Sequence, residues 1–303
     1  MTHPVRRLRA VPSADVIRLD AATVALQWSV GGMAMCWFTT RRRVVGVGYG
    51  WLLRGVYAAL AALGLAAGLR TEGFGVRELS AAAVVIACCA VLAVSIVRRH
   101  AGVALAEAEH DRRSARVAAM TGIERGSERG SIRGSEFPPL LDLVPVALGV
   151  IGLIAGAYSA VDGSGSDEVV SVLRVLVGAL FLGAVTDAML LGHWYLVQPG
   201  LPRSVLNEIV GALGALWPAE LVVMLLPTGM LSVLSGSVDD GWGGQLGWFW
   251  LACTITTIVL VFVTRAALRE RQYSAVMAAT GLLYLAILTA FGMDLVARAV
   301  LAG

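Results

Sequence analysis

Long, uninterrupted apolar runs are the feature of this 303-residue sequence that most limits how the chain can fold. As a helix, a run of about 20 such residues crosses a hydrocarbon core of roughly 30 Å. The runs do not alternate between apolar and polar residues, which excludes a membrane β-barrel. We therefore expect an all-α fold, a polytopic membrane helix bundle with about eight transmembrane helices.

The composition agrees with a membrane protein. Hydrophobic residues make up 57% of the chain and charged residues only 15%, against roughly 25% charged residues in an average soluble protein. The net charge of +3 is small and spread over several loops, so we expect no nucleic-acid partner. All 24 basic residues are arginine, which suggests a GC-rich coding bias. The four cysteines lie in apolar runs without the spacing of a metal site or a disulfide framework, and we interpret them as packing residues.

The spans divide the chain into three parts. Residues 1–98 carry the first three spans, residues 99–138 form a cytoplasmic helix extension and flexible linker, and residues 139–303 carry the last five. The first span is the apolar run that contains Gln27 and ends at Arg41. If this run fails to cross, seven spans remain and the N-terminus lies inside. The later spans are expected at residues 44–68, 79–98, 139–161, 170–198, 204–235, 246–268 and 274–299.

Arginine bias sets the expected orientation, because cytoplasmic loops are enriched in arginine and lysine. The loop after the third span is rich in arginine, and the loop after the seventh holds Arg269 and Arg271, so both are expected in the cytoplasm. The loops at residues 162–168 and 239–245 contain acids and no arginine, and are expected on the opposite face together with both termini. The near-repeated Glu-Arg-Gly-Ser tetrapeptides at residues 124–135 are typical of a flexible tether. The expected localisation is the cytoplasmic (inner) membrane of a bacterium, as a multi-pass protein.

Two acids in the fifth and sixth spans, Asp187 and Glu220, are candidates for a proton or ion relay. A charge near the bilayer centre costs about 2.5–3.5 kcal/mol on insertion scales, so such groups face the bundle interior and find partners. Counting from the span centres gives both acids comparable depths, with Arg54 in reach of Asp187 as a counter-charge. Pro218 and Pro227 are expected to interrupt the sixth helix, as in the discontinuous helices that form midplane sites in transporters. The alternative is structural: an ion pair of Arg54 with Asp187, and a hydrogen-bonded Glu220 that holds helices together.

A second candidate site lies at the cytoplasmic end of the fifth span. His193, Trp194, Tyr195 and Arg203 are the residues expected to border a quinone or substrate pocket there. The simpler interpretation of the two aromatic residues is an interfacial belt followed by a turn. Haem is a further alternative, but it usually needs a second histidine, and the only candidate is His100.

Near the opposite face, Arg174, Asp294 and Arg298 lie close to helix ends, and are expected to pair or to extend to the interface. A faint similarity between residues 59–68 and 147–156 would suit a parallel repeat, although chance is the simpler explanation in a chain so rich in alanine, leucine and glycine.

Three functional hypotheses follow from these residues. The first is proton- or ion-coupled transport of a small molecule through a midplane polar site. The second is a quinone-binding, or less favourably a haem-binding, membrane subunit of a redox complex. The third is a non-catalytic membrane scaffold or assembly protein with a membrane-protein partner. No hydrolase triad, zinc-binding HExxH, phosphate loop or dinucleotide fingerprint is present, so the sequence identifies neither an enzyme activity nor a cofactor.

Overall fold

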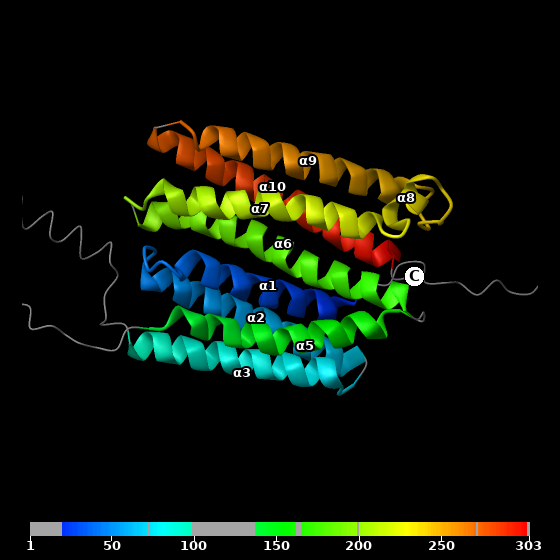
Figure 1. Ribbon diagram of the computed structural model, residues 1–303, viewed down its shortest axis with the longest axis horizontal. Coiled ribbons are helices and arrows are strands. Elements are labelled where there is room, and N and C mark those ends of the chain that lie inside the picture. The colour runs from blue at the N-terminus through cyan, green and yellow to red at the C-terminus, as the bar shows by residue number, and fades with distance from the viewer. Residues whose placement is uncertain are drawn as a thin grey trace, which may run out of the picture.

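The computed structural model describes residues 20–71, 73–98, 137–161, 165–198, 200–270 and 272–301. These residues form helices and connecting turns without any strand, which confirms the expected all-α bundle (Figure 1). A 3-10 turn, η2 (Pro139–Asp142), precedes α5, and a short helix, α8 (Gly229–Leu234), follows α7. The eight long helices in the described part of the chain are α1 (Ala21–Thr40), α2 (Val47–Thr71), α3 (Val76–Val97), α5 (Leu143–Ser159), α6 (Ser166–Val197), α7 (Arg203–Leu225), α9 (Gln245–Ala267) and α10 (Tyr273–Leu301).

Seven of these helices are long and apolar enough to cross a membrane, and α1 is the exception. With 20 residues, α1 measures about 30 Å, the thickness of a hydrocarbon core. It runs through the middle of the bundle (Figure 1). Only Ala21 of this helix is exposed, and the polar residues Gln27 and Ser29 are buried. The first expected span is therefore a full-length helix, and its lower hydropathy reflects neighbours that are protein instead of lipid.

The long helices form two four-helix units that follow one another along the chain. In the first unit α1 packs against α2, α2 against α3, α3 against α5, and α5 against α1. In the second unit α6, α7, α9 and α10 close a ring in the same order. Both units begin at the same end of the bundle and alternate in direction, so α1 and α6 occupy equivalent places (Figure 1). The units meet mainly where α1 and α5 pack against α6.

Small residues bring α1 and α6 into close contact. A Cβ atom on Gly31 would lie 1.6 Å from the carbonyl oxygen of Ala179, and a Cβ atom on Gly183 would lie 2.2 Å from the carbonyl oxygen of Gly31. In the apolar 18-residue stretch of α6, 56% of the residues are buried, against 33–39% in the corresponding stretches of the other six helices that could span a membrane. The outer helices instead expose large apolar side chains, such as Ile86 of α3 and Phe262 of α9, where lipid would contact them.

The sixth expected span, residues 204–235, consists of two helices instead of one. The helix α7 continues through Pro218, so the expected interruption there is wrong, and it ends two residues before Pro227. Proline has no N–H to offer the carbonyl group four residues earlier. For Pro227 that carbonyl belongs to Val223, and Nε of Arg174 donates to its oxygen at 3.0 Å instead.

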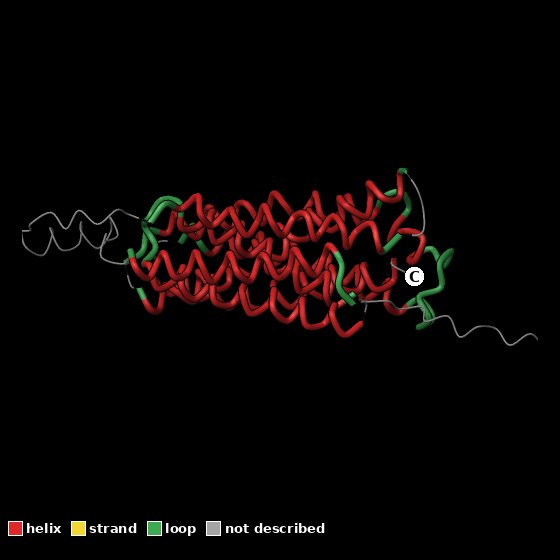
Figure 2. The backbone as a smooth tube through the Cα atoms, turned by 90° about the horizontal axis from the view of Figure 1, so that it is seen from below, coloured by secondary structure: helices red, strands yellow, loops and turns green. Residues whose placement is uncertain are grey.

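The helices run the length of the molecule, and the loops gather at its two ends (Figure 2). We call one the arginine end, because it carries Arg41, Arg42, Arg203 and Arg269 at the turns between helices. The opposite end, where α1, α3, α6 and α9 begin, is called the cavity end. That the arginine end faces the cytoplasm stays a prediction. Most of the expected linker, residues 99–136, lies outside the described residues.

Candidate functional site

A cavity of about 290 Å³ lies at the cavity end, between the two four-helix units. Its wall comes from α1 and α5 of the first unit and from α6, α7 and α10 of the second. Val24, Val175 and Met224 make part of the wall apolar, while Arg174 and Arg298 supply guanidinium groups. A largely apolar cavity of this size with a few convergent polar groups is typical of a small-molecule site.

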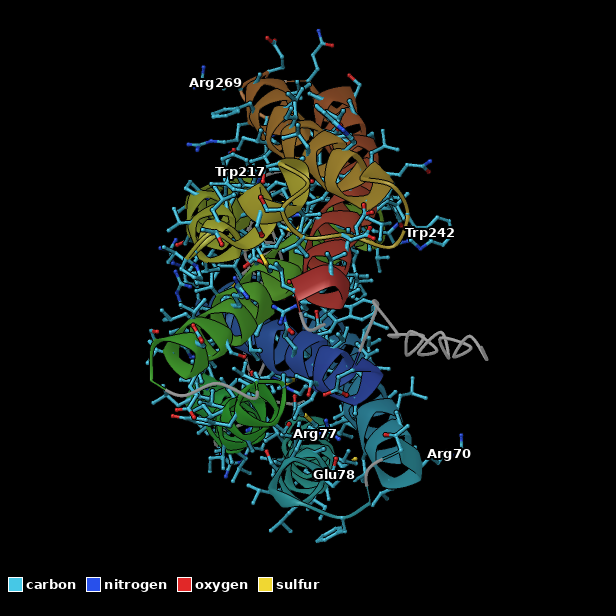
Figure 3. All side chains as sticks on the ribbon, turned by 90° about the vertical axis from the view of Figure 1, so that its right-hand side faces the viewer. Arg70, Arg77, Glu78, Trp217, Trp242 and Arg269 are labelled. Carbon is cyan, nitrogen blue, oxygen red and sulfur yellow. The ribbon has the colours of Figure 1, made fainter. Side chains whose placement is uncertain are left out.

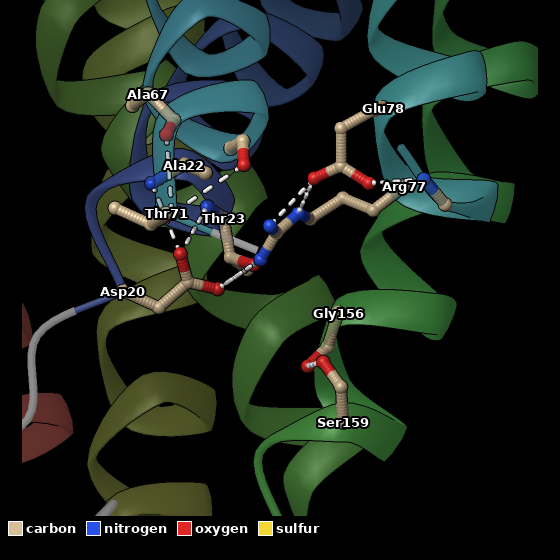
Figure 4. A network of polar contacts seen from close by, with 11 residues as sticks. Asp20, Ala22, Thr23, Ala67, Thr71, Arg77, Glu78, Gly156 and Ser159 are labelled. Atoms are coloured by element: carbon tan, nitrogen blue, oxygen red, sulfur yellow. Dashed lines mark hydrogen bonds and ion pairs between the residues drawn. The ribbon is translucent and has the colours of Figure 1, made fainter. Parts of the chain in front are cut away.

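An ion-pair cluster borders the cavity on the side of the first unit (Figure 4). Asp20, which lines the cavity, caps α1 by accepting hydrogen bonds from the backbone N–H groups of Ala22 at 3.0 Å and Thr23 at 3.2 Å. Nη1 of Arg77 donates to the second oxygen of Asp20 at 2.6 Å, and Nε of Arg77 donates to Glu78 at 2.7 Å. An end-on view shows Arg77 and Glu78 together at this end of the molecule (Figure 3). The cluster anchors the start of α1 to the start of α3.

Two arginines of the second unit line the cavity with part of their donors unused. Nε of Arg298 donates to both oxygens of Asp294 at 2.9 Å, which confirms this expected pair, and Nη2 donates to the carbonyl oxygen of Arg174 at 2.7 Å. Nε and Nη2 of Arg174 bind the carbonyl oxygens of Val223 and Leu226 at the end of α7. No described residue accepts a hydrogen bond from Nη1 of either arginine. Each guanidinium can therefore offer further N–H groups to a ligand.

Glu220 lies behind this wall and is fully buried, with an exposed fraction of 0%. Met224, one helical turn further along α7, lines the cavity. The charged groups that act on Glu220 are Asp294, Arg298 and Arg174. Neither carboxylate oxygen of Glu220 has a hydrogen-bond donor within the described part of the chain. Because an unpaired buried charge is costly, a carboxyl group in these surroundings is a candidate for exchanging protons with the cavity.

Gln27 of α1 lies in the same buried region. Its exposed fraction is 0%, and neither atom of its amide has a partner among the residues described. Gly178 of α6 makes room for the group: a Cβ atom there would lie 2.3 Å from Nη2 of Arg298, 2.6 Å from Nε2 of Gln27 and 2.8 Å from Oδ1 of Asp294. These side chains therefore converge on one point of α6. We name Gln27, Arg174, Glu220, Asp294 and Arg298 the outer polar cluster.

Asp187 belongs to a separate place between the two units. The hydroxyl group of Tyr57 donates to Oδ1 of Asp187, and that of Tyr49 donates to its backbone carbonyl at 3.3 Å. Oδ2 is buried and has no partner among the described residues. Asp187 lies about 14 Å along α6 from Gly178, at about 1.5 Å per residue. The structure therefore does not bring Asp187 and Glu220 into one site.

Arg54 does not pair with Asp187, contrary to the expectation. Its Nε and Nη2 donate to the two oxygens of Asp142 at 2.7 and 2.8 Å, and its Nη1 donates to Ser95 at 3.1 Å. Arg54 thus faces α3 and the start of α5, inside the first unit, whereas Tyr57, one turn later on α2, reaches α6. The exposed fractions of the Arg54 and Asp142 side chains are 3% and 0%, so this is a buried bidentate ion pair.

Three of the four residues predicted to border a quinone pocket are engaged in the turn region at the arginine end. None of them lines the 290 Å³ cavity, which lies at the opposite end. The indole N–H of Trp194 donates to the side-chain oxygen of Gln198. The hydroxyl group of Tyr195 donates to the carbonyl oxygen of Pro202, and the guanidinium group of Arg203 donates to that of Glu270. The turn accounts for these contacts, and the interfacial position of the two aromatic residues stays a prediction.

His193, the fourth of these residues, is exposed on the outside of the bundle. Its Nδ1 lies 3.5 Å from the hydroxyl oxygen of Tyr284 on α10, and the two rings meet edge to face with centroids 6.4 Å apart. The histidine proposed as a second haem ligand, His100, lies outside the described residues. The structure therefore leaves His193 with one aromatic neighbour on a face that lipid would contact.

No protein-family model matches the chain, and no curated protein or solved structure is significantly similar to it. Within the described ranges, no three histidine, cysteine, aspartate or glutamate side chains are grouped as metal ligands would be. Function is therefore inferred from the chemistry of the site, which consists of guanidinium, carboxyl and amide groups around an apolar cavity.

Sequence reasoning missed Asp142 and Tyr57, and it also missed the ion-pair cluster of Asp20, Arg77 and Glu78 beside the cavity. Asp142 had a readable signal, because it is an acid inside an expected span, as Asp187 is. Tyr57 had none, since a tyrosine in an apolar helix is common and its partner on α6 is distant in the sequence. Gln27 was visible as a polar residue in an apolar run, but its position beside Asp294 and Arg298 depends on the packing of α1 against α6.

Proposed function

We propose that this integral membrane protein transports a small molecule across the bilayer and couples that movement to protons. The observation that carries the proposal is the position of Glu220. It is a buried carboxyl group without a hydrogen-bond donor in the described part of the chain, directly behind a cavity that two four-helix units share.

The architecture supports this proposal. In secondary transporters, substrate and coupling-ion sites lie where two repeated units meet, and helices that end within the membrane contribute backbone groups to them. The cavity lies between the two units, and the carbonyl groups at the end of α7 reach it through Arg174. Rocking of one unit against the other is the movement such an interface allows.

In this proposal Glu220 takes a proton from the cavity, and Asp187 is the next carboxyl group between the units towards the arginine end. Arg54 is assigned to holding α2, α3 and the start of α5 together, since Asp142 and Ser95 occupy its guanidinium group. We also propose that the membrane is the cytoplasmic membrane of a bacterium, with the arginine end inside.

Proteoliposomes that contain a pH-sensitive dye test the proposal. Panels of small acids, amines, sugars and amino acids are added outside, and solute-driven proton movement is recorded. We expect at least one solute class to move protons in the unmodified protein. Glu220→Gln should abolish this movement, because an amide cannot exchange the proton, while Asp239→Asn in an exposed loop at the same end serves as the matched control.

Two outcomes would contradict the proposal. Proton movement that persists in Glu220→Gln and in Asp187→Asn would show that neither carboxyl group takes part. Absence of proton movement with every solute, in protein that stays folded, would favour a scaffold or assembly role, in which the buried polar groups only join helices.

One observation favours a second candidate function, binding of a quinone from the lipid phase. His193 and Tyr284 present an imidazole and a phenol side by side on the outer face of the bundle, where a quinone carbonyl could accept hydrogen bonds. Lipid extracts of the purified protein should then contain quinone, and His193→Leu should remove it. Extracts free of quinone would count against this candidate.

A further inference from the structure

We propose that the cavity binds a small monoanionic carboxylate, and that Glu220 must carry a proton when it does. The inference rests on the proposed function and names the substrate class of the same site. It is carried by the donors that line the cavity and by the balance of charge behind them.

The unused donors of Arg174 and Arg298 are placed to hold a carboxylate. Both side chains line the cavity, and their Nε and Nη2 atoms are fixed by Asp294 and by carbonyl oxygens. Fixed guanidinium groups need little further ordering when their Nη1 atoms bind an anion. Hydrogen bonds from such groups to a carboxylate are roughly twice as strong as neutral ones.

One proton changes the net charge of the outer polar cluster from zero to one positive charge. Arg174 and Arg298 carry two positive charges, and Asp294 with an ionised Glu220 carries two negative charges, so the cluster is neutral. With a proton on Glu220 the cluster has one excess positive charge, which a monoanion in the cavity balances. Proton and anion therefore bind together, which is the stoichiometry of a symport step.

Two other acids, Asp20 and Asp167, line the cavity. Asp20 shares Arg77 with Glu78, so these three residues together carry one excess negative charge at the edge of the cavity. Because this charge is the same in both protonation states of Glu220, a proton on Glu220 still adds one positive charge beside the cavity. Asp167 is exposed at the start of α6, where water and salt screen its charge.

Among the described residues near Glu220, the other carboxyl group is that of Asp294 on α10, and Nε of Arg298 donates to both of its oxygens at 2.9 Å. The cluster members on α6, α10 and α1 are Arg174, the pair Asp294 and Arg298, and the uncharged Gln27. The helix α8 has no charged residue, and the charged residue of α9, Arg265, lies in its last turn at the arginine end. The pH dependence of anion binding is therefore assigned to Glu220.

The cavity suits a carboxylate that carries a short apolar group. Val24, Val175 and Met224 form apolar wall, while both arginines belong to α6 and α10 on one side. We therefore use benzoate as the probe, with benzamide as its neutral counterpart and benzylamine as a cation of similar size.

Binding is measured by calorimetry on the full chain, purified in detergent without added lipid. We expect benzoate to bind at least about tenfold more tightly than benzamide, and benzylamine not to bind, because only the carboxylate makes charge-assisted hydrogen bonds. Benzoate affinity should fall as pH rises, because Glu220 loses its proton and the excess positive charge is lost. Equal binding of benzoate and benzamide, or no binding of either, would overturn the inference.

Variants separate the roles of the two kinds of group. Glu220→Gln should bind benzoate without pH dependence, since the amide fixes the neutral form. Arg174→Lys keeps the charge but removes the planar fork, and should weaken benzoate binding by about tenfold. Arg70→Gln, at an exposed arginine at the end of α2, is the matched control and should bind as the unmodified protein does. An unchanged pH dependence in folded Glu220→Gln would overturn the assignment of the proton.

A lipid headgroup offers the same oxyanion chemistry as a free carboxylate, so a further arm separates the two sources. The titration is repeated in nanodiscs of phosphatidylcholine with and without phosphatidylglycerol. We expect benzoate to bind in both. Two results together would assign the site to the headgroup and overturn the inference. The first is that benzoate binds in nanodiscs without phosphatidylglycerol but not in those with it. The second is that phosphatidylglycerol co-purifies with the protein and benzoate fails to bind in detergent.

The two proposals fail in different ways. Benzoate binding without any solute-driven proton movement would leave the inference standing and remove the transport function. Proton movement with a neutral or cationic solute, and no benzoate binding, would do the reverse.

Discussion

The side chains of Arg54 and Asp142 share two hydrogen bonds in a site that excludes water. We predict that Arg54→Ala lowers the free energy of unfolding by about 3–5 kcal/mol, because it leaves the carboxylate of Asp142 buried and unpaired. The measurement is thermal or denaturant unfolding of purified protein in detergent. Arg70→Ala is the control, and we expect a change within about 0.5 kcal/mol, since Arg70 is exposed.

A double variant distinguishes the ion pair from simple loss of packing. Replacing both partners, as Arg54→Met with Asp142→Asn, removes the unpaired charge, and we expect it to be more stable than either single variant. If the loss of stability in the double variant equals the sum of the losses in the two single variants, the two side chains are not coupled, contrary to the structure.

The identity of these partners was beyond sequence reasoning for a physical reason. Counting residues along a helix gives depth, and the depth of Arg54 is compatible with several acids on neighbouring helices. Which acid it meets depends on the rotation of α2 about its own axis, and that rotation is set by packing against α1 and α3. The sequence could therefore nominate Arg54, Asp187 and Glu220 as buried charges, but not connect them.

At the level of helices, the contact of α1 with α6 is tested at Gly183. A methyl group there would approach the backbone of Gly31 to 2.2 Å, and backbone cannot move aside as a flexible side chain can. We predict that Gly183→Ala lowers the free energy of unfolding by at least about 1–3 kcal/mol, the usual cost of overpacking. Gly211→Ala on α7, where a Cβ atom meets nothing within 4 Å, is the matched control and should be neutral or stabilising. Equal effects of the two substitutions would mean that the helices are further apart than the structure has them.

The start of α9 is held by the carboxylate of Asp240. It accepts hydrogen bonds from the backbone N–H groups of Trp242 at 2.9 Å, Gly244 at 2.8 Å and Leu246 at 2.8 Å. Desolvation raises the pKa of Asp240, but the backbone N–H donors together outweigh it, and the net pKa lies below the usual range.

This lowered pKa predicts how stability depends on pH. The carboxylate stabilises the loop fully above the pKa that it has in the unfolded chain, about 3.9, and the contribution is lost as pH falls through the lower pKa of the folded protein. Asp240→Asn should therefore have a lower unfolding temperature than the unmodified protein near neutral pH, with the difference narrowing below about pH 4. Ser237→Ala in the same loop is the control. A difference that is constant from neutral to acid pH would rule out the carboxylate as its cause.

Helix positions were largely readable from the sequence, and their ends less so. Each expected span has a long helix, because apolar runs bounded by arginine or glycine leave few alternatives. The span at residues 204–235 was predicted as one helix because its hydropathy continues beyond Pro227. In the structure the helical backbone stops at Leu225 and starts again at Gly229, which hydropathy does not indicate. The internal Pro218 was expected to break α7 and does not, which hydropathy cannot reveal.

For the whole molecule, the orientation in the membrane is a direct prediction. In a variant whose four cysteines are replaced by alanine, a single cysteine at Ser237 probes the cavity end and one at Arg269 probes the arginine end. With an impermeant maleimide on spheroplasts of a bacterial host, we expect labelling at Ser237, and labelling at Arg269 only after permeabilisation, because arginine-rich loops stay in the cytoplasm. The reverse pattern would place the cavity on the cytoplasmic side.

The division into two four-helix units was not predictable. The faint similarity between residues 59–68 and 147–156 joins α2 and α5, which belong to the same unit, so it does not relate the two units. The equivalent helices, α1 and α6, differ in hydropathy and length, since α6 has 32 residues and α1 has 20. Only their shared central position reveals the correspondence, and a central position has no fixed sequence pattern.

The enclosure of α1 has a consequence for how the protein is made. A nascent helix that enters the bilayer alone must be apolar enough to partition into lipid. Among the eight long helices in the described part of the chain, α1 is the one that falls short, yet the ribosome completes it before any of the helices that surround it. We therefore expect it to wait, paired with α2 or held by the insertion machinery, until α5 and α6 emerge and cover it. Among the described helices, the one that is synthesised earliest would then be among the last to reach its final surroundings.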